Sequence, residues 1–410
     1  MKKQGKNSAG LYVHFPFCVS KCAYCDFISY TGLPPLKDYS SAVLQEIKLR
    51  ADDFRDCSFS SIYFGGGTPS LWNPDSIKAI IKEAVSLLHF NENPEITLEI
   101  NPGTADGEKL KAFRKAGVNR LSVGVQSLSD GELRTLGRIH DSKVALAVIS
   151  SAVSSGFQNI SADLIYSVPG QSLESFQRSL GGIVDTGITH VSLYELTIHE
   201  GTPFYRMIEQ GQLVLPSEEF SVDVYRGSER FLESAGFEHY EISNWAKPEF
   251  KCVHNVNCWE CGYYMGIGVG AHGHQPSEYP NDIDLLGKNA AEACHVRYSN
   301  IKDVKEYMSN LVDGKAPTIW SEVVSREARV MEKIYLGLRM MKGLKLEDLK
   351  RDVYNVYINN TIKGERALNK IETECKALIS EEYLTNNNGK ICFTGKGEIV
   401  ADQVILRLMP

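Results

Sequence analysis

The feature that most constrains the fold of this 410-residue chain is an alternation of short apolar and amphipathic segments over about its first 240 residues. The apolar segments have strand length, and we expect strands at Leu11–Phe15, Ser61–Phe64, Glu95–Ile100, Arg120–Val125, Ile160–Tyr166 and His190–Leu196. The segments between them have helical periodicity, and we expect helices at Lys37–Phe54, Pro74–His89, Gly107–Ala116, Ser142–Ser155 and Ser172–Asp185. Repeated strand–helix units imply an α/β fold with a parallel sheet, either doubly wound or closed like a barrel. Six units would make an incomplete barrel rather than an eight-stranded one.

The rest of the chain has a different pattern and predicts two further parts. From Trp245 to about Asn300 the sequence is irregular and rich in Gly, His, Asn and Cys, so we expect loops, with a short strand or turn at GIGVGAHG. Beyond it we expect helices at Ser321–Met341, Leu344–Val353 and Ala367–Ile379, a hairpin turning at Asn388–Gly389, and a final helix. This part resembles a winged-helix module, and its mixed charges favour docking over DNA binding. We therefore predict a core barrel over 1–240, a connecting segment over 241–310 and a small helical, winged-helix-like C-terminal domain over 311–410.

Composition excludes several classes of protein. The net charge of -7 leaves no basic surplus to neutralise phosphates, which argues against nucleic-acid binding. The polar N-terminal sequence has no signal-peptide pattern, and no apolar stretch has membrane-spanning length. We therefore expect a cytoplasmic protein. Ten cysteines suit a reducing compartment, and scattered ones such as Cys294 are expected to be ordinary thiols.

Three cysteines directly after the first expected strand carry the strongest chemical signal. Cys18, Cys22 and Cys25 have the spacing C-x3-C-x2-C. Structural zinc sites usually pair C-x2-C ligands and reach four donors, and a disulfide framework needs an even number of cysteines. Three thiolates in eight residues instead suit an iron–sulfur cluster with one iron left without a protein ligand. Such an iron can bind a small molecule directly.

Polar or glycine residues stand at the ends of the following strands. The second strand runs into Gly65-Gly66-Gly67-Thr68, where the backbone can approach a ligand closely. Later strands deliver the polar residues Glu99, Gln126, Asp163 and, just beyond the fourth strand, Arg138. Each could be a tight turn or a solvated residue on its own, but together they predict a ligand site. Carboxylates there would suit ribose hydroxyls or an ammonium group, and arginine would suit a carboxylate.

Taken in order, these motifs resemble the radical S-adenosylmethionine (SAM) superfamily, and within it the oxygen-independent coproporphyrinogen III oxidase group. The resemblance covers nearly the whole chain through YVHFPFCVSKCAYCDF, YFGGGTPSL, LEINPGT, RLSVGVQSL, DLIYSVPGQ, YELTIHEGTPF and YEISNWA. It implies an incomplete TIM-like (β/α)6 barrel that holds a 4Fe–4S cluster, with SAM chelating the open iron. One electron would then cleave SAM to a 5′-deoxyadenosyl radical.

The resemblance also assigns residues. The cluster ligands would be Cys18, Cys22 and Cys25, and the contacts to the SAM on the cluster would be Tyr12, Gly66 and Glu99. Positions that line a second SAM site in the oxidase are matched by Tyr24, Gly67, Thr68, Gln126, Arg138 and Asp163. Whether one or two SAM molecules bind is left open.

Two departures from the oxidase point to a related branch. The oxidase has a fourth cysteine two residues after the third, where this chain has Phe27. That substitution is typical of the relatives called HemW, which act as haem chaperones. The segment KCVHNVNCW resembles their motif HNxxYW: His254, Asn255 and Trp259 match, but Cys258 replaces tyrosine. The GIGVGAHG segment, with His272, also fits.

Histidine and cysteine are both common haem ligands, so the resemblance makes His254 a candidate haem contact. Two alternatives stay open. His254 could be a buried histidine bonded to the backbone, or Cys252, Cys258 and Cys261 could form a small metal site with His254 or His272.

The resemblance therefore implies a protein that binds a 4Fe–4S cluster, SAM and haem and delivers haem to acceptor proteins. It would need an electron donor. Whether it is an enzyme stays open, as do the haem recipient, contact with a membrane through a partner, and assembly as a homodimer. The alternatives are an oxygen-independent coproporphyrinogen III oxidase, which Phe27 argues against, and a radical SAM enzyme acting on another tetrapyrrole or a lipid.

Overall fold

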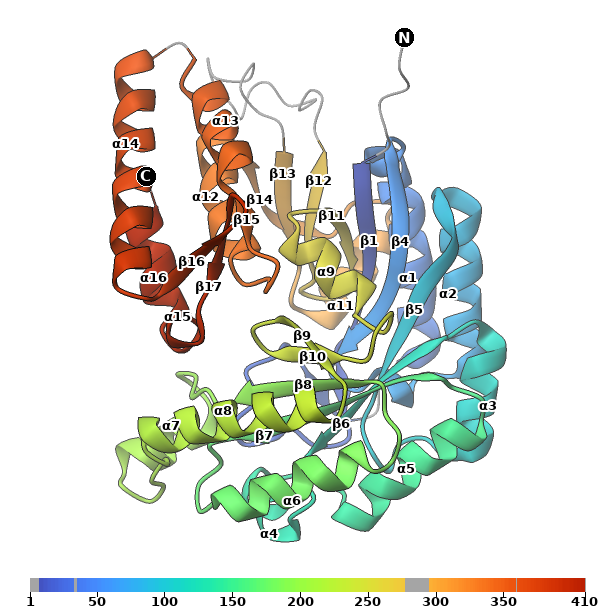
Figure 1. The fold of residues 1–410 in the computed structure, drawn as a ribbon. Helices are drawn as coiled ribbons and strands as arrows, with labels where there is room; N and C mark the ends of the chain where they lie inside the picture. Colours follow the sequence, from blue (N-terminus) through green and yellow to red (C-terminus); the bar gives the residue numbers. More distant parts are fainter. Residues whose placement is uncertain (1–6, 33–34, 277–294, 359, 410) are drawn as a thin grey trace.

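The computed structural model describes residues 7–32, 35–276, 295–358 and 360–409, so Cys294 lies outside the described residues. Six parallel strands lie side by side in chain order: β1 (Asn7–Phe15), β4 (Cys57–Gly66), β5 (Phe90–Ile100), β6 (Arg120–Gln126), β7 (Asn159–Tyr166) and β8 (His190–Glu195). Helices follow these strands: α1 (Leu36–Arg50), α2 (Pro74–Leu87), α3 (Gly107–Ala116), α5 (Ser142–Ser154), α6 (Leu173–Val184) and α8 (Glu218–Ser234). Figure 1 shows the helices along the outer side of the curved sheet. The predicted (β/α)6 fold class is confirmed.

Local sequence explains where these helices begin. The N-cap side chains of Asn73, Asp106, Asp141 and Ser172 each accept a hydrogen bond from a backbone N–H in the first turn of α2, α3, α5 and α6. The apolar side chains of α6 at Phe176, Leu180 and Ile183 lie on one face of the helix and are buried. Helix and strand faces therefore agree with the sequence pattern in this half of the chain.

In its described residues, the predicted loop region after Trp245 is mostly regular structure, so the expectation of loops was wrong, whereas the short strand or turn expected at GIGVGAHG is present. It contains α9 (Val253–Trp259), β11 (Tyr263–Ile267), β12 (His272–Pro276) and β13 (His295–Asn300). Strand β11 pairs in parallel with β1, and β12, β13 and β14 (Thr318–Val324) extend the sheet antiparallel beyond it. At its other end β8 pairs with β10 (Asn244–Ala246) and then β9 (Glu238–Glu241), which gives twelve strands in all.

In the sequence the glycines of this segment indicate loops, but in the structure they allow neighbouring strands and side chains to approach the backbone closely. A Cβ at Gly266 would lie 1.7 Å from the carbonyl oxygen of His272, and one at Gly273 would enter the ring of Tyr298. The strand pair β11–β12 therefore requires glycine at positions that sequence pattern alone assigns to turns.

The C-terminal part forms a separate core from three helices and a hairpin. These are α12 (Arg326–Gly337), α13 (Leu346–Val356), α14 (Thr361–Ser380), β15 (Leu344–Lys345), β16 (Leu384–Asn387) and β17 (Lys390–Phe393), followed by α15 (Gly395–Ile399) and α16 (Ala401–Leu408). The Asn388–Gly389 turn has positive φ at both residues, as a two-residue hairpin requires. The helix expected from Ser321 begins only at Arg326, after the N-cap Ser325, because the residues before it belong to β14.

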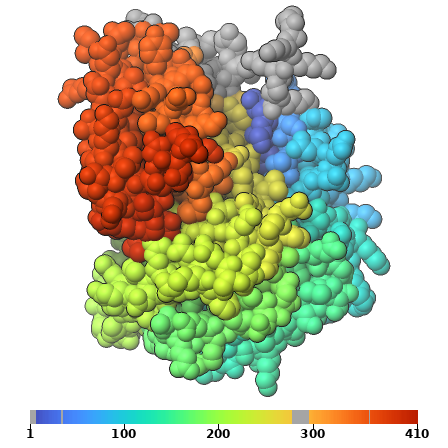
Figure 2. Space-filling view, viewed as in Figure 1, coloured from blue at the N-terminus to red at the C-terminus, as the bar shows by residue number. Residues whose placement is uncertain are grey.

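We call residues 326–409 the C-terminal module, and it packs against the barrel through backbone and side chains. Its Met341 N–H donates to the carbonyl of Tyr240, and its Arg339 carbonyl accepts from the N–H of Ile242, so the module covers the β9 edge. Figure 2 shows the orange and red surface of the module directly against the yellow-green surface of the barrel. Within the described residues, no helix is long and apolar enough to cross a membrane.

Candidate functional site

A cavity of about 500 Å³ opens at the carboxyl ends of the parallel strands, where ligand sites of α/β folds gather. We call it the cofactor cavity. The predicted residues that line it are Cys18, Cys22, Tyr24, Cys25, Gly66, Gly67, Thr68, Glu99, Gln126, Arg138 and Asp163. Eleven of the thirteen predicted site residues thus meet at one place, because the ends of neighbouring parallel strands share one edge of the sheet. Tyr12 and His254 are not among the lining residues.

Each of the three cysteine sulfurs has a hydrogen-bond donor. Thr68 Oγ1 lies 3.4 Å from Cys18 Sγ, and Arg138 Nη1 lies 3.6 Å from Cys22 Sγ. The backbone N–H of Phe27 donates to the Cys25 thiol. The donors would stabilise negative charge on the sulfurs, as a thiolate-bound cluster requires.

The separation of the cysteine sulfurs is compatible with a cluster. In the part of the chain that the structure describes, only Glu229, His239 and Glu398 bring three donor atoms within 4.8 Å of one another. The three cysteine sulfurs are thus not all within 4.8 Å of one another, which suits a cluster, because cluster thiolates bind separate irons. Cys252, Cys258 and Cys261 do not form a compact ion site either.

The glycine turn after β4 is held tightly against the cysteine loop. Gly67 N–H donates to the Phe15 carbonyl at 2.7 Å, and a Cβ at Gly67 would lie 2.7 Å from the Phe17 carbonyl oxygen. Gly66 has φ +112° and its N–H donates to Glu99 Oε2 at 3.0 Å. Glycine is thus required at both positions by backbone geometry.

Two carboxylates face the cavity from β5 and β7, the strands on either side of β6. Burial, and then the nearby Asp163, raise the pKa of Glu99 to about 7, against hydrogen bonds from Tyr63 and Gly66. Burial also raises the pKa of Asp163, although the Ser122 hydroxyl donates to it at 3.1 Å. A cationic or hydroxyl-bearing ligand would relieve the repulsion between these two groups.

Arg138 is fixed in place by neutral acceptors. Its Nη2 donates to Asn101 Oδ1 at 2.6 Å and to the Gly124 carbonyl at 2.9 Å. Tyr24 lies beside it, and burial raises the pKa of the Tyr24 hydroxyl. The guanidinium therefore places a positive charge directly on the cysteine loop.

His254 and Tyr12 lie inside the barrel, beneath the cofactor cavity. His254 Nδ1 is 2.9 Å from Ser61 Oγ, and its ring centroid is 5.1 Å from that of Tyr63 and 6.3 Å from that of Tyr12. Burial and the charge of Arg120 lower the pKa of His254 to about 4. The partner is a side chain rather than the backbone carbonyl considered from sequence, and the ring is enclosed, so haem could reach it only if α9 moved.

Several further residues line the cofactor cavity that were not predicted from the sequence. Tyr194, Glu195 and Thr197, around the end of β8, line the cavity, and so do Tyr63 and Asn101. Asn101 stands two residues after Glu99 at the end of its strand, which was a usable signal. The end of β8 carries no such signal in the sequence, because polar residues are common at the end of any strand.

Comparison with known proteins agrees with this site. The profile of the Radical SAM superfamily matches residues 12–181. "Heme chaperone HemW" of Haemophilus influenzae is 39% identical over 270 residues, which cover 64% of this chain and 69% of that protein. "Heme chaperone HemW" of Mycobacterium tuberculosis is 30% identical over 405 residues, 98% of this chain and 94% of that protein.

The chain belongs to the HemW family of radical SAM proteins. Membership implies a 4Fe–4S cluster and SAM, for which Cys18, Cys22 and Cys25 and the surrounding cavity provide fitting residues.

A further curated relative and one solved structure are also similar to this chain. The bovine mitochondrial "Radical S-adenosyl methionine domain-containing protein 1" is 39% identical over 272 residues, which span 66% of this chain and 61% of that protein. The solved structure of coproporphyrinogen III oxidase (HemN) from Escherichia coli has a TM-score of 0.77 and 22% identity, covering 100% of this chain and 91% of that one. At this identity the likeness shows a shared fold alone.

Proposed function

We propose that this protein is a haem chaperone: it holds a 4Fe–4S cluster and SAM in the cofactor cavity, binds haem, and delivers it to acceptor proteins. The proposal depends most on the cysteine loop. Its three sulfurs each have a donor, while two residues after Cys25, where the oxidase has a fourth cysteine, this chain has Phe27, which is 63% exposed. The near full-length relatives named heme chaperone support the same function.

Within the cofactor cavity this chain's own residues would bind and orient SAM. Glu99 and Asp163 suit its ammonium and ribose hydroxyls, and Arg138 suits a carboxylate. The Gly66 and Gly67 turn lets the backbone approach the ligand closely. When present, the reduced cluster would supply the electron that cleaves SAM.

An anaerobic comparison of two activities tests the proposal. The cluster is reconstituted, haem binding is followed by absorbance, and coproporphyrinogen III conversion is followed by chromatography. We expect stoichiometric haem binding and no decarboxylated product. Robust protoporphyrinogen IX formation would instead establish the oxidase function and overturn the chaperone.

A cysteine variant controls for the cluster. Cys22→Ala is expected to abolish the cluster absorbance, whereas Cys57→Ala, at a buried thiol outside the cofactor cavity, is expected to retain it. The electron donor, the acceptor, a cytoplasmic location, a homodimer and membrane contact through a partner stay predictions.

A further inference from the structure

A second cavity of about 510 Å³ lies between the barrel and the C-terminal module, and we call it the interdomain cavity. The barrel contributes the ends of β7 and β8, one face of α8 and the turn between β9 and β10. The module contributes Arg339 and the segment from Glu398 to Gln403. Its volume falls in the range of cavities that bind cofactor-sized ligands.

The two cavities share a wall. Tyr194, Glu195 and Thr197 line both of them. A ligand in the interdomain cavity would therefore be adjacent to the cofactor cavity without entering it.

Apolar surface is exposed on both sides of the interdomain cavity. Tyr194 on the barrel side is 44% exposed, and Ile399 on the module side is 41% exposed. Tyr166, Leu193 and Tyr225 add further apolar or aromatic lining. Aromatic and aliphatic side chains from both parts of the chain thus provide contact surface for a flat ring system.

One end of the cavity suits an anionic group. Arg339 pairs there with Asp402, whose side chain is 69% exposed. The buried Nε of Arg339 has no hydrogen-bond partner among the described residues. Helix α16 begins at Ala401 on the same wall, and no side chain caps its N-terminus. Because the Asp402 carboxylate of this pair is open to water, a ligand carboxylate could replace it on the guanidinium.

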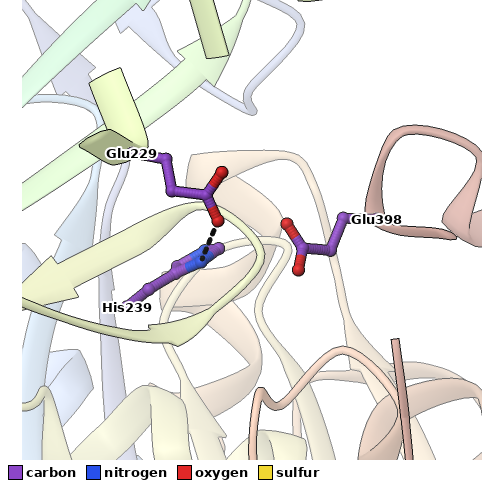
Figure 3. Close-up of side chains that lie close together, drawn as sticks. All are labelled: Glu229, His239 and Glu398. Atoms are coloured by element: carbon purple, nitrogen blue, oxygen red, sulfur yellow. Dashed lines mark ion pairs between the residues drawn. The ribbon is translucent and has the colours of Figure 1, made fainter. Parts of the chain in front are cut away.

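The other carboxylates of the cavity are already engaged. Glu398 pairs with Arg226 at 3.3 Å, and Arg226 also pairs with Glu229 at 2.7 Å. Figure 3 shows Glu398 of the module facing Glu229 and His239 of the barrel. Glu195 accepts a hydrogen bond from the Ser221 hydroxyl at 2.6 Å. Arg339 is therefore the group best placed to take up an added negative charge.

We propose that the interdomain cavity is the haem-binding site, with the porphyrin between Tyr194 and Ile399 and a propionate on Arg339. This proposal rests on the proposed haem-chaperone function and adds the location of the haem. A site between two parts of the chain leaves one edge of the porphyrin open for transfer. It also leaves His254 in its buried contact with Ser61.

The test is haem titration of the full-length, cluster-loaded protein, followed by absorbance. Ile399→Glu places a carboxylate against the porphyrin, and we expect at least tenfold weaker binding. Ile362→Glu is the matched control, since Ile362 is an 80% exposed isoleucine of the same module outside the cavity, and we expect unchanged affinity.

A second experiment tests the propionate contact. Haem and haem dimethyl ester are compared on the natural protein and on Arg339→Gln. We expect the natural protein to bind haem about tenfold more tightly than the ester, as a charged hydrogen bond predicts, and Arg339→Gln to bind the two equally. Unchanged thermal unfolding and cluster absorbance check the fold of each variant.

The outcomes separate the two proposals. If the natural protein does not bind haem, the proposed function fails. If it binds haem but Ile399→Glu equals Ile362→Glu and Arg339→Gln still prefers haem to its ester, the interdomain site is wrong while the function stands.

Discussion

The contact between Arg138 and Cys22 predicts a measurable shift in the properties of the cluster. Arg138→Met removes the positive charge and the N–H donor 3.6 Å from Cys22 Sγ and keeps an unbranched side chain. A 4Fe–4S cluster gains negative charge on reduction, and hydrogen bonds to its sulfurs favour that state. We therefore expect the variant to have a lower reduction potential.

The size of the shift follows from the distance. Two unit charges 3.6 Å apart interact by about 4–5 kcal/mol at an effective dielectric constant of 20, which is an upper bound because the added electron spreads over the cluster. A hydrogen bond to a charged group contributes about 1.5–3 kcal/mol, and this long contact belongs at the low end. About 1.5 kcal/mol is roughly a tenfold change, or about 60 mV for a one-electron couple.

The assay is a redox titration of the reconstituted protein, followed by electron paramagnetic resonance of the reduced cluster. Arg138→Lys keeps the charge and is expected to have an intermediate potential. Arg134→Met, at an exposed position of α4 (Asp130–Thr135), is the matched control and is expected to have the natural potential. An unchanged potential in Arg138→Met with intact cluster absorbance, or an equal fall in the control, would refute the reasoning.

Three further predictions concern binding and stability. Because the pKa of Glu99 is raised to about 7, its carboxylate forms mainly above that pH, and SAM affinity is expected to rise about tenfold from pH 6 to 8. Glu99→Gln should remove this pH dependence. A SAM affinity that does not change with pH in the natural protein would contradict the assignment. Glu46→Gln leaves the buried Arg50 without its charged partner at 2.7 Å, so the free energy of unfolding, measured with denaturant, is expected to fall by about 3–5 kcal/mol. Glu83→Gln, in a more exposed pair, is expected to lower it by under about 1 kcal/mol. Equal losses in the two variants would disprove this difference. Position 66 has φ +112°, and the Cβ of Gly66→Ala would lie 2.4 Å from the His14 ring, so SAM binding measured by calorimetry is expected to be lost. An affinity equal to that of the natural protein would show that the turn can adjust.

The sequence predicted the barrel and the edge where its site lies because both follow from periodicity and topology. Six apolar strands with intervening helices allow few arrangements, and parallel strands bring Glu99, Asp163 and the cysteine loop to one edge. The position of His254 could not be predicted this way. It depends on α9 folding under the barrel against Ser61, a contact between residues far apart in the chain.

The same limit explains the glycine-rich segment. Gly266 and Gly273 look like turn residues until the neighbouring strand and the Tyr298 ring are known, because their role is to leave space for those partners. Tyr194 and Glu195 were missed for a related reason. They line both cavities, and no local pattern in β8 indicates either the barrel interior or the C-terminal module.

The pairing of β1 with β11 has a consequence for how the protein is made. Strand β1, which leads into the cysteine loop, aligns Ala9 with Tyr263, so one of its two neighbours leaves the ribosome long after it. Contacts that join distant parts of a chain form slowly. The loop therefore emerges early, while its strand is still unpaired on one side, and this interval during synthesis is when iron and sulfide would have the freest access to its thiols.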